Sequence, residues 1–268
     1  MKTTLFYYTA TGNALSIARS LAAGLGETEL EPVARYRKAG VAPAAERVGI
    51  VFPIYAWGPP RSVEEFLDKL DLREARYVFA VATCGGTAGN ALPELKKALV
   101  KRGGRLDAGF IVRSPGYLDG DGSNQGMIEA VRRLSGKLPP TDSERLPRII
   151  ELVRSGKRGP VERSALPGAL LGSFLHRKAL PAFAGLDSNY AVSEACTGCG
   201  TCVRVCPRSN VRLSGGRPEW LHDCDNCGAC AAWCTSGAIG SGGAAATPRR
   251  HNPAVVAADL MWARTEGP

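Results

Sequence analysis

The sequence predicts an α/β fold in which a doubly wound parallel sheet is followed by a small, cysteine-rich α+β domain. Short apolar runs alternate with helical patterns from Met1 to about Ser155, the pattern of strands joined by crossover helices. Eight of the nine cysteines lie between Cys196 and Cys234, in two runs of identical spacing. A chain of 268 residues is long enough to form both domains.

Five segments, the first of them apolar and β-prone, are predicted to form the sheet, and each is separated from the next by a helical pattern or a turn. In a doubly wound sheet of strand order 2-1-3-4-5, a ligand binds at the carboxyl ends of the strands, where the first and third strands diverge. We therefore expect the loops after strands one, three and four to bind it. The predicted strands are Thr3 to Thr9, Thr28 to Ala34, Arg47 to Pro53, Tyr77 to Thr83 and Asp107 to Val112.

The loop after the first strand has the composition of a phosphate site. It reads Thr9-Ala10-Thr11-Gly12-Asn13-Ala14 and opens directly into a helix. Two hydroxyls, the backbone N–H groups and the positive end of the helix can all face one anion. The chain contains neither the G-x-G-x-x-G nor the G-x-x-x-x-G-K-[ST] motif, which disfavours nicotinamide and nucleoside triphosphate sites. A helix cap without a ligand is the alternative.

The other two loops suit a flat ring. Pro53 to Pro60 carries Tyr55 and Trp57 in a rigid turn, where a ring system can stack. Thr83 to Asn90 is rich in glycine, which lets the backbone approach a ring edge. Ordinary turns with a packing tryptophan are the alternative. The candidate cofactor residues are Thr9, Thr11, Gly12, Asn13, Ala14, Pro53, Tyr55, Trp57, Gly58, Thr83, Cys84, Gly85, Gly86, Gly89 and Asn90. Within this set we expect Cys84 to be a small packed side chain, not a reactive thiol.

The two cysteine runs predict two equivalent iron-sulfur sites. Each run reads C-x-x-C-x-x-C-x-x-x-C, and a shift of 28 residues places every cysteine of the first on one of the second, which indicates a duplicated unit. In such runs the first three thiolates bind one cube and the fourth binds the other. One 4Fe-4S cluster is thus expected on Cys196, Cys199, Cys202 and Cys234, and the second on Cys224, Cys227, Cys230 and Cys206.

Two other uses of eight cysteines are disfavoured. Four disulfides would need an oxidising compartment, and Thr9, Thr11 and Gly12 interrupt the only apolar stretch that resembles an export signal. Zinc sites prefer two C-x-x-C pairs with a long spacer, so the third cysteine of each run would be surplus. Reduced, cluster-binding thiols favour a cytoplasmic location.

These motifs resemble known families. Thr9 to Asn13 is similar to the T-x-T-G-N loop with which flavodoxins bind the phosphate of FMN, and the first cysteine run resembles that of bacterial two-cluster ferredoxins. The second run departs from that pattern because Thr235 replaces the proline that follows the last cysteine. Taken whole, the chain resembles the flavodoxin and ferredoxin fusion family, found mainly in anaerobic microbes.

This resemblance implies FMN and two 4Fe-4S clusters in one polypeptide, but no known substrate. It divides the chain into a flavodoxin-like FMN-binding domain (1–156, strand order 2-1-3-4-5), a basic and apolar connector (157–186) and a ferredoxin-like two-cluster domain with a C-terminal tail (187–268). It also implies that the peptide of Gly58 interacts with N5 of the reduced flavin.

Net charge and hydropathy limit the classes of partner that the chain can have. The formal net charge is +9, but two oxidised clusters and a flavin phosphate would bring it to roughly +3, which removes most of the case for nucleic acid. No apolar run is long enough to span a membrane, although the apolar segment Leu166 to Leu175 leaves peripheral membrane contact open. The expected partner is a redox protein that donates or accepts electrons. The sequence indicates no oligomeric state.

Three functions remain open. Clusters carry single electrons and FMN carries two, so a chain with both is best interpreted as an electron carrier that converts between the two. An FMN-dependent oxidoreductase that reduces a quinone or another small acceptor, and a redox sensor, are the alternatives. No catalytic residue is assigned, because no convincing general acid or base lies near the loops. Asp119 to Asn124 only partly matches a calcium loop and is expected to be a loop after the fifth strand. His176, His222 and His251 are expected to be packed or solvated, with His222 close enough to Cys224 to donate to a sulfur.

Overall fold

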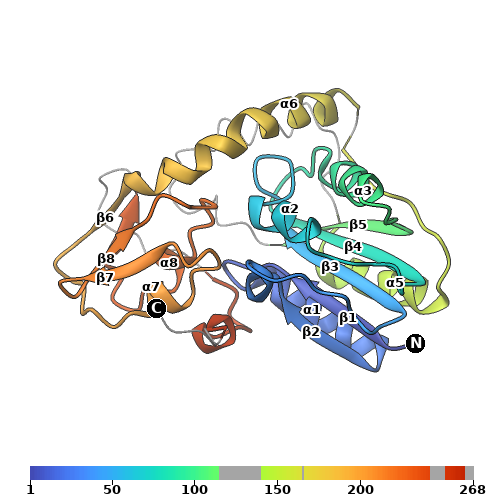
Figure 1. The fold of residues 1–268 in the computed structure, drawn as a ribbon, viewed down its shortest axis with the longest axis horizontal. Coiled ribbons are helices and arrows are strands. Elements are labelled where there is room, and N and C mark those ends of the chain that lie inside the picture. The colour runs from blue at the N-terminus through green and yellow to red at the C-terminus, as the bar shows by residue number, and fades with distance from the viewer. Residues whose placement is uncertain (115–139, 165, 242–250, 263–268) are drawn as a thin grey trace.

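A computed structural model of the chain describes residues 1–114, 140–164, 166–241 and 251–262. The loop expected at Asp119 to Asn124 lies outside the described residues. Within the described part, the chain forms a five-stranded sheet with its helices, a long crossing helix and a small module that holds the two cysteine runs (Figure 1).

The sheet is parallel throughout, and its strand order is β2-β1-β3-β4-β5. This is the flavodoxin-like order 2-1-3-4-5 that the sequence predicted, and the prediction is confirmed. Side chains on both faces of the central strands are buried, which is why these segments read as continuous apolar runs. The strands are β1 (Thr3–Tyr7), β2 (Thr28–Pro32), β3 (Arg47–Pro53), β4 (Tyr77–Cys84) and β5 (Ala108–Arg113).

Helices cover the sheet on both sides. The helices α1 (Asn13–Leu25) and α5 (Asp142–Ser155) pack on one face, and α2 (Arg61–Leu67) and α3 (Ala91–Lys101) pack on the other (Figure 1). In α1 the buried positions recur every three or four residues, as in an amphipathic helix that faces a core. A short 3-10 helix, Val33–Tyr36, follows β2.

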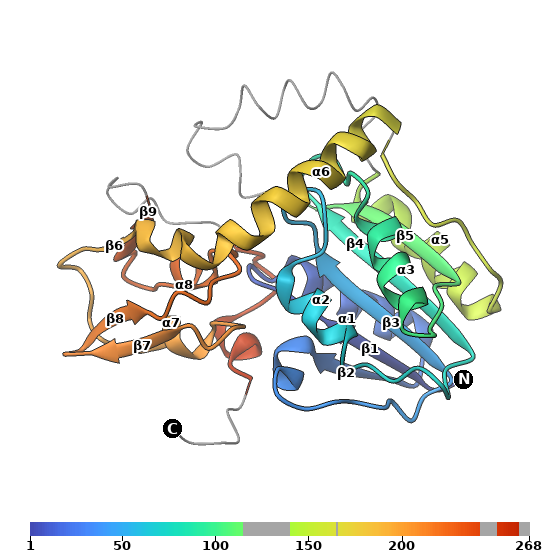
Figure 2. The same cartoon turned by 45° about the horizontal axis from the view of Figure 1, so that its top comes forward.

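The connector begins along the open edge of β5. The amide of Gly109 donates to the carbonyl of Pro160 at 2.8 Å, and the carboxylate of Glu162 accepts from the amide of Ile111 at 2.8 Å. These bonds cover backbone groups that an edge strand would otherwise expose. The helix α6 (Leu166–Ala182) then crosses from the sheet to the cysteine-rich module (Figure 2).

In the residues that the structure describes, the cysteine-rich module contains two short helices and two pairs of antiparallel strands. A 3-10 helix, Phe183–Asn189, leads into it from α6. Strand β6 (Tyr190–Val192) pairs with β9 (Ile239–Ser241), and β7 (Val211–Ser214) pairs with β8 (Arg217–Trp220). The helices are α7 (Thr201–Arg204) and α8 (Ala229–Ala232).

The backbone of the module repeats itself. Gly198 and Gly200 have φ values of 67° and 71°, and the residues 28 positions later, Asn226 and Gly228, have φ values of 52° and 71°. The two short helices begin with the same offset, at Thr201 and Ala229. The duplication read from the cysteine spacing therefore extends to the conformation of the loops.

The last described segment, residues 251–262, returns to the sheet domain. Val255 and Leu260 are buried in the same apolar cluster as α1. Trp262 donates from Nε1 to the hydroxyl of Tyr7 at 3.3 Å, and Asp259, in the 3-10 helix Ala257–Leu260, pairs with Arg19 at 2.7 Å. None of the helices in the described residues combines the length and the apolar character needed to cross a bilayer.

Candidate redox cofactor site

A cavity of about 320 Å³ lies at the carboxyl ends of β1, β3 and β4, where a doubly wound sheet binds its ligand. Its walls come from the loops after these strands, from the start of α1 and from the cysteine-rich module. The lining residues are Thr9, Ala10, Thr11, Asn13, Ala14, Pro53, Ile54, Tyr55, Ala56, Thr83, Cys84, Gly85, Ser114, Phe183, Asn226, Cys227 and Gly228.

Nine of the fifteen candidate cofactor residues line this cavity, and they come from all three loops. These are Thr9, Thr11, Asn13, Ala14, Pro53, Tyr55, Thr83, Cys84 and Gly85. The other six, Gly12, Trp57, Gly58, Gly86, Gly89 and Asn90, are not among the lining residues. The structure thus brings the first loop together with the first residues of the other two loops, which directly follow β3 and β4.

The first loop has the geometry of an anion site. Gly12 has a φ of 94°, which favours glycine, and its amide donates to the Thr9 hydroxyl at 3.2 Å. The loop leads into α1, whose N-terminal N–H groups and dipole attract negative charge. A Cβ at Gly12 would lie 3.0 Å from Cβ of Val255, so the C-terminal segment packs directly against the loop.

The turn after β3 divides its two aromatic residues between different surroundings. Tyr55 lines the cavity and packs edge-on against Tyr8, with ring centroids 6.2 Å apart. Trp57 instead donates from Nε1 to the Thr87 hydroxyl at 3.0 Å and packs against Gly172 of α6. Only one of the two expected rings is therefore positioned to touch a ligand in the cavity.

Gly58 closes the same turn. Its amide and carbonyl are both bonded to Tyr55, at 3.1 and 2.9 Å, and Ala56 and Trp57 between them have φ values of 45° and 67°. A Cβ at Gly58 would lie 2.4 Å from the ring of His176, so no side chain fits there. His176 is buried, with Nδ1 3.2 Å from the Tyr55 carbonyl oxygen.

Cys84 ends β4 at the wall of the cavity. Its thiol is 8 % exposed and donates to the Gly86 carbonyl at 3.4 Å. Burial raises the pKa of Cys84 to about 12, and this thiol is therefore protonated at neutral pH. The residue is packed and unreactive in this setting.

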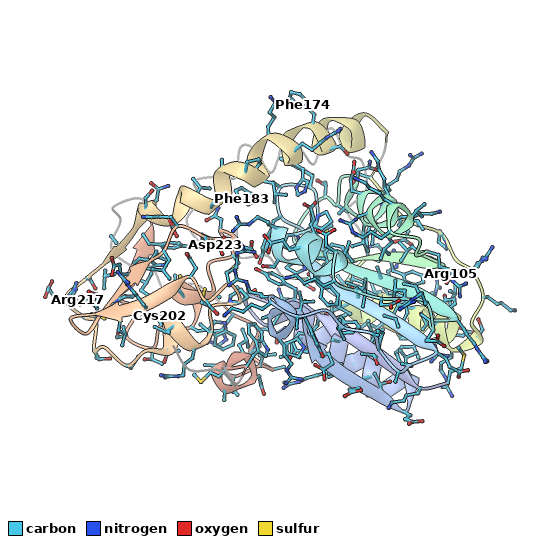
Figure 3. All side chains as sticks on the ribbon, in the orientation of Figure 1. Arg105, Phe174, Phe183, Cys202, Arg217 and Asp223 are labelled. Carbon is cyan, nitrogen blue, oxygen red and sulfur yellow. The ribbon has the colours of Figure 1, made fainter. Side chains whose placement is uncertain are left out.

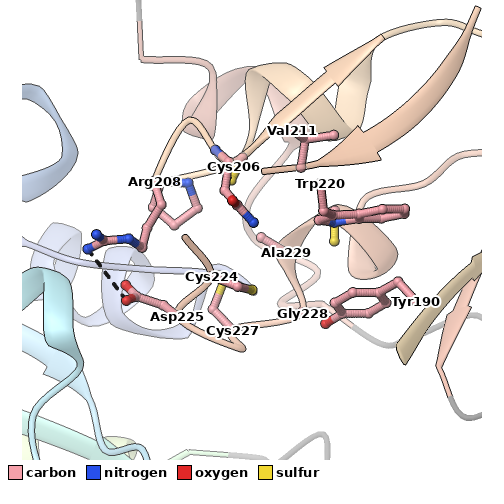
Figure 4. A pocket seen from close by; sticks show the side chains of 13 residues that line it. Tyr190, Cys206, Arg208, Val211, Trp220, Cys224, Asp225, Cys227, Gly228 and Ala229 are labelled. Atoms are coloured by element: carbon pink, nitrogen blue, oxygen red, sulfur yellow. Dashed lines mark hydrogen bonds and ion pairs between the residues drawn. The ribbon is translucent and has the colours of Figure 1, made fainter. Parts of the chain in front are cut away.

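A second pocket, in the cysteine-rich module, is ringed by four thiols (Figure 4). They are Cys206 from the first run and Cys224, Cys227 and Cys230 from the second. The pocket thus brings together the four cysteines that the spacing assigns to one cluster. Apolar side chains from Val211, Trp220 and Ala229 close the same pocket.

The remaining four cysteines also face one another. The pKa of Cys202 is raised to about 11, first by burial and then by the negative charges of Cys234, Cys199 and Cys196. The Thr201 hydroxyl lies 3.4 Å from Sγ of Cys199 and lowers the pKa of this exposed thiol to about 7. Amides point at sulfur as well: Ala238 donates to Cys234 and Asn210 donates to Cys206, both at 3.3 Å.

The two sets of four cysteine sulfurs suit four-iron clusters better than single metal ions. Within the described residues, no three thiols, imidazoles or carboxylates converge closely enough to hold one metal ion. A four-iron cube holds its ligands further apart than one ion does, and it needs all four sulfurs of each set. Burial raises the pKa of Cys224 to about 11 and that of Cys227 well above its usual range, so these thiols lose their protons only against the positive charge of iron.

Cys227 and Gly228 line both the cavity at the sheet and the four-cysteine pocket. No residue of the module or the connector was predicted to lie at the cavity. Asn226, Cys227 and Gly228 of the module and Phe183 of the connector were missed for this reason, and the cysteine spacing carries no signal that could have found them. Ser114 was also missed, although its place directly after β5 was a usable signal.

His222 pairs with a carboxylate. Its Nδ1 lies 2.7 Å from Oδ1 of Asp187, and its backbone amide donates to Oδ2 of the same carboxylate at 3.1 Å. This pair joins the 3-10 helix before β6 to the second cysteine run.

Comparison with known proteins agrees with the cysteine-rich part of the chain. Residues 195–239 match the model of the 4Fe-4S dicluster domain. Joined to a sheet of flavodoxin-like strand order, this segment defines an iron-sulfur redox protein of the electron-transfer and oxidoreductase class. No curated protein matches the chain.

Several solved structures resemble the sheet domain distantly. A putative flavoprotein from Bacteroides uniformis is 19 % identical over 43 % of this chain and 92 % of its own, with a TM-score of 0.35. Flavodoxin 1 from Bacillus cereus is 17 % identical over 58 % of this chain and 96 % of its own, with a TM-score of 0.38. An NAD(P)H:quinone oxidoreductase from Methanothermobacter marburgensis is 9 % identical over 58 % and 96 %, with a TM-score of 0.38. The strand order, and not these weak likenesses, defines the fold class.

Proposed function

We propose that the protein is an electron carrier that binds FMN in the cavity of the sheet domain and two 4Fe-4S clusters in the module, and that it passes electrons between them. One observation carries this proposal: Cys227 lines both the cavity and the four-cysteine pocket. A flavin in the first and a cluster in the second would be separated by little more than that side chain. Flavin exchanges one or two electrons and each cluster exchanges one.

The cluster on Cys206, Cys224, Cys227 and Cys230 is, in this proposal, the one beside the flavin; we call it the proximal cluster. The distal cluster is bound by Cys196, Cys199, Cys202 and Cys234. The exposed position of Cys199 supports a role for the distal cluster in exchange with an external redox protein, because electrons must enter near the surface. Residues 1–156 would then carry the flavin, 157–186 connect, and 187–268 carry the clusters.

The residues at the cavity fit FMN. Thr9, Thr11 and the N-terminus of α1 would hold its phosphate by hydroxyl and backbone donors. Tyr55 offers one ring for the flavin to pack against, and the loop from Thr83 to Gly85 approaches from the other side. We propose FMN and not FAD, because the described lining holds one phosphate loop and offers no second site for an adenosine.

The lining also favours a carrier over an enzyme. Among the described residues that line the cavity there is no carboxylate, histidine, lysine or arginine. General acid or base catalysis on a substrate most often uses such a group within hydrogen-bond reach. Burial raises the pKa of Tyr55 and of Cys84, which makes these two lining groups poor proton donors at neutral pH. Electron transfer needs only that the cofactors be held close together and kept from water.

Acid release of the flavin from anaerobically reconstituted protein tests the cofactor assignment, and chromatography distinguishes FMN from FAD. Iron and sulfide analysis on the same sample should give eight of each per chain if both expected clusters form. Rapid mixing of reduced protein with candidate acceptors then separates the two functions. A carrier should reduce a one-electron protein acceptor fastest, whereas sustained turnover with a quinone would support the oxidoreductase instead.

A further inference from the structure

A buried carboxylate ties the second cysteine run to the sheet domain. Asp225 lies between Cys224 and Cys227, and its side chain is 1 % exposed. Its Oδ2 accepts hydrogen bonds from the Tyr8 hydroxyl at 2.7 Å and from the Ser62 hydroxyl at 2.5 Å. Both donors belong to the elements that carry the cofactor loops: Tyr8 directly precedes the phosphate loop, and Ser62 lies in α2, directly after the turn of Tyr55 to Gly58.

A buried guanidinium completes the contact from the first cysteine run. Arg208, two residues after Cys206, is 4 % exposed. It donates to Glu65 at 3.0 Å, to Asp223 at 2.7 Å and to the Ser62 hydroxyl at 3.1 Å. One hydroxyl group, that of Ser62, thus donates to Asp225 and accepts from Arg208. Figure 4 shows Arg208 and Asp225 reaching out of the four-cysteine pocket toward the sheet domain.

The contact between the cysteine-rich module and the sheet domain, which we call the seam, has balanced charges. Three guanidinium groups face three carboxylates: Arg37, Arg61 and Arg208 pair with Glu65, Asp223 and Asp225. Arg37 and Arg61 each reach Asp223, at 2.8 and 2.5 Å. Oδ1 of Asp225 has no hydrogen bond within the described residues and lies 3.7 Å from both Arg61 and Arg208. Asp223 and Phe183 lie in the seam between the two parts of the molecule (Figure 3).

A balanced ionic cluster of this kind gives little net stability, because desolvation offsets the attraction between the charges. Its effect is geometric. Loss of one partner leaves an unpaired buried charge, so one arrangement of the module on the sheet domain is strongly preferred over neighbouring ones. Apolar contacts alone would allow the module to shift or rotate.

We propose that Asp225 and Arg208 are positioning residues that lock both loops of the proximal cluster onto the flavin cavity, so that electrons pass between the cofactors without movement of the module. This inference rests on the proposed function for its cofactors. It adds that the carrier works as one rigid unit, in which the only encounter required is with the external redox partner.

Two measurements on the holoprotein, with FMN and both clusters present, test whether Asp225 and Arg208 hold the module in place. Hydrogen exchange reports how often the seam opens, through the amides of residues 9–13 and 224–228. The rate of intramolecular electron transfer after rapid reduction, measured with increasing glycerol, reports whether a domain movement limits the step. Transfer within the wild-type protein should not depend on viscosity.

Variants should separate positioning from general stability. In Asp225→Asn and Arg208→Gln, amide protection at the seam should fall by at least about tenfold, and the transfer rate should fall and become viscosity-dependent. Tyr8→Phe, which removes one donor and lies outside the cysteine runs, should produce a smaller change of the same kind even if Asp225→Asn loses its cluster. Arg212→Gln is the matched control, since it breaks an exposed ion pair with Glu219 in the same module.

The proposal that the module is held in place is wrong if electron transfer between the cofactors of the wild-type protein slows as viscosity rises. It is also wrong if Tyr8→Phe and Arg208→Gln match Arg212→Gln in both readouts while cofactor content is full. Failure of the proposed function would look different. In that case the wild-type protein would lack FMN or show no transfer, while exchange at the seam would still report on the ionic contact.

Discussion

Asn252 donates from Nδ2 to Oδ1 of Asn13 at 2.9 Å, which joins the C-terminal segment to the phosphate loop across 239 positions of sequence. The amide of Asn252 also donates to the carbonyl of Thr11 at 2.8 Å. Trp233 adds a third contact, from Nε1 to the carbonyl of Ala10 at 2.7 Å. The loop that we propose for FMN phosphate is therefore shaped from outside by Trp233 of the second cysteine run and by Asn252, which follows that run.

We expect Asn252→Ala to weaken FMN binding severalfold, because loss of about 1 kcal/mol from one hydrogen bond leaves the phosphate loop less ordered. Fluorescence titration of flavin-free protein with FMN measures the effect. Asp259→Asn is the control, since it changes an exposed ion pair with Arg19 in the same segment and should leave affinity nearly unchanged. Equal affinities in the two variants would contradict a role for the C-terminal segment at the loop.

Cys206→Ser and Cys234→Ser should damage different clusters. Because Cys206 faces the pocket that shares Cys227 with the cavity, its variant should slow flavin reduction by reduced ferredoxin more than the Cys234 variant does. Stopped-flow absorbance follows the flavin, and EPR confirms which cluster is lost. Direct reduction by dithionite should persist in both variants. Wild-type rates with ferredoxin in both variants, with cluster loss verified, would exclude the clusters as the route.

Gly58→Ala should destabilise the protein by about 1–3 kcal/mol, the usual cost of forcing an extra group into a packed site. The cause is steric, because a Cβ there would lie 2.4 Å from the ring of His176. In the double variant Gly58→Ala/His176→Ala, the cost should be smaller than the sum of the two single changes. Denaturant unfolding of all four proteins measures the coupling. Strict additivity would show that the clash is not the cause.

Cys84 should resist alkylation at pH 9, where an exposed cysteine with a pKa of 9.0 is half ionised. With its pKa raised by burial to about 12, only about one Cys84 in a thousand is a thiolate at that pH. The thiolate fraction, and with it the labelling rate, should rise tenfold for each further pH unit until the pKa is reached. Iodoacetamide labelling of flavin-free, cluster-loaded protein, read by peptide mass spectrometry, measures this rate. Labelling at the rate of a free peptide thiol would contradict the buried position.

The sequence alone was enough for the features that depend on local pattern. Apolar runs between helical patterns predicted β1, β3, β4 and β5, since strands buried on both faces can hold little that is polar. The edge strand β2 is polar and only partly buried, and its place between two helical patterns predicted it. Cysteine spacing predicted the duplicated module, whose two loops share their backbone conformation. It also grouped Cys206 with the second run, and the structure places these four thiols around one pocket. The composition of Thr9 to Ala14 predicted a loop that opens a helix at the switch point.

Only the tertiary structure decided how the cysteine-rich module contacts the sheet domain. The positions of Asp225 and Arg208 in the sequence reveal nothing of Tyr8, Ser62 or Glu65, because their pairing depends on how two separately patterned units dock. The sequence predicted that the Trp57 ring stacks on a cofactor, but in the structure Trp57 packs against α6 and donates to Thr87. Which cluster lies beside the cavity is likewise invisible in two runs of identical spacing. Local sequence carries the period and the ligand spacing, whereas the distance between cofactors arises from contacts between residues more than a hundred positions apart.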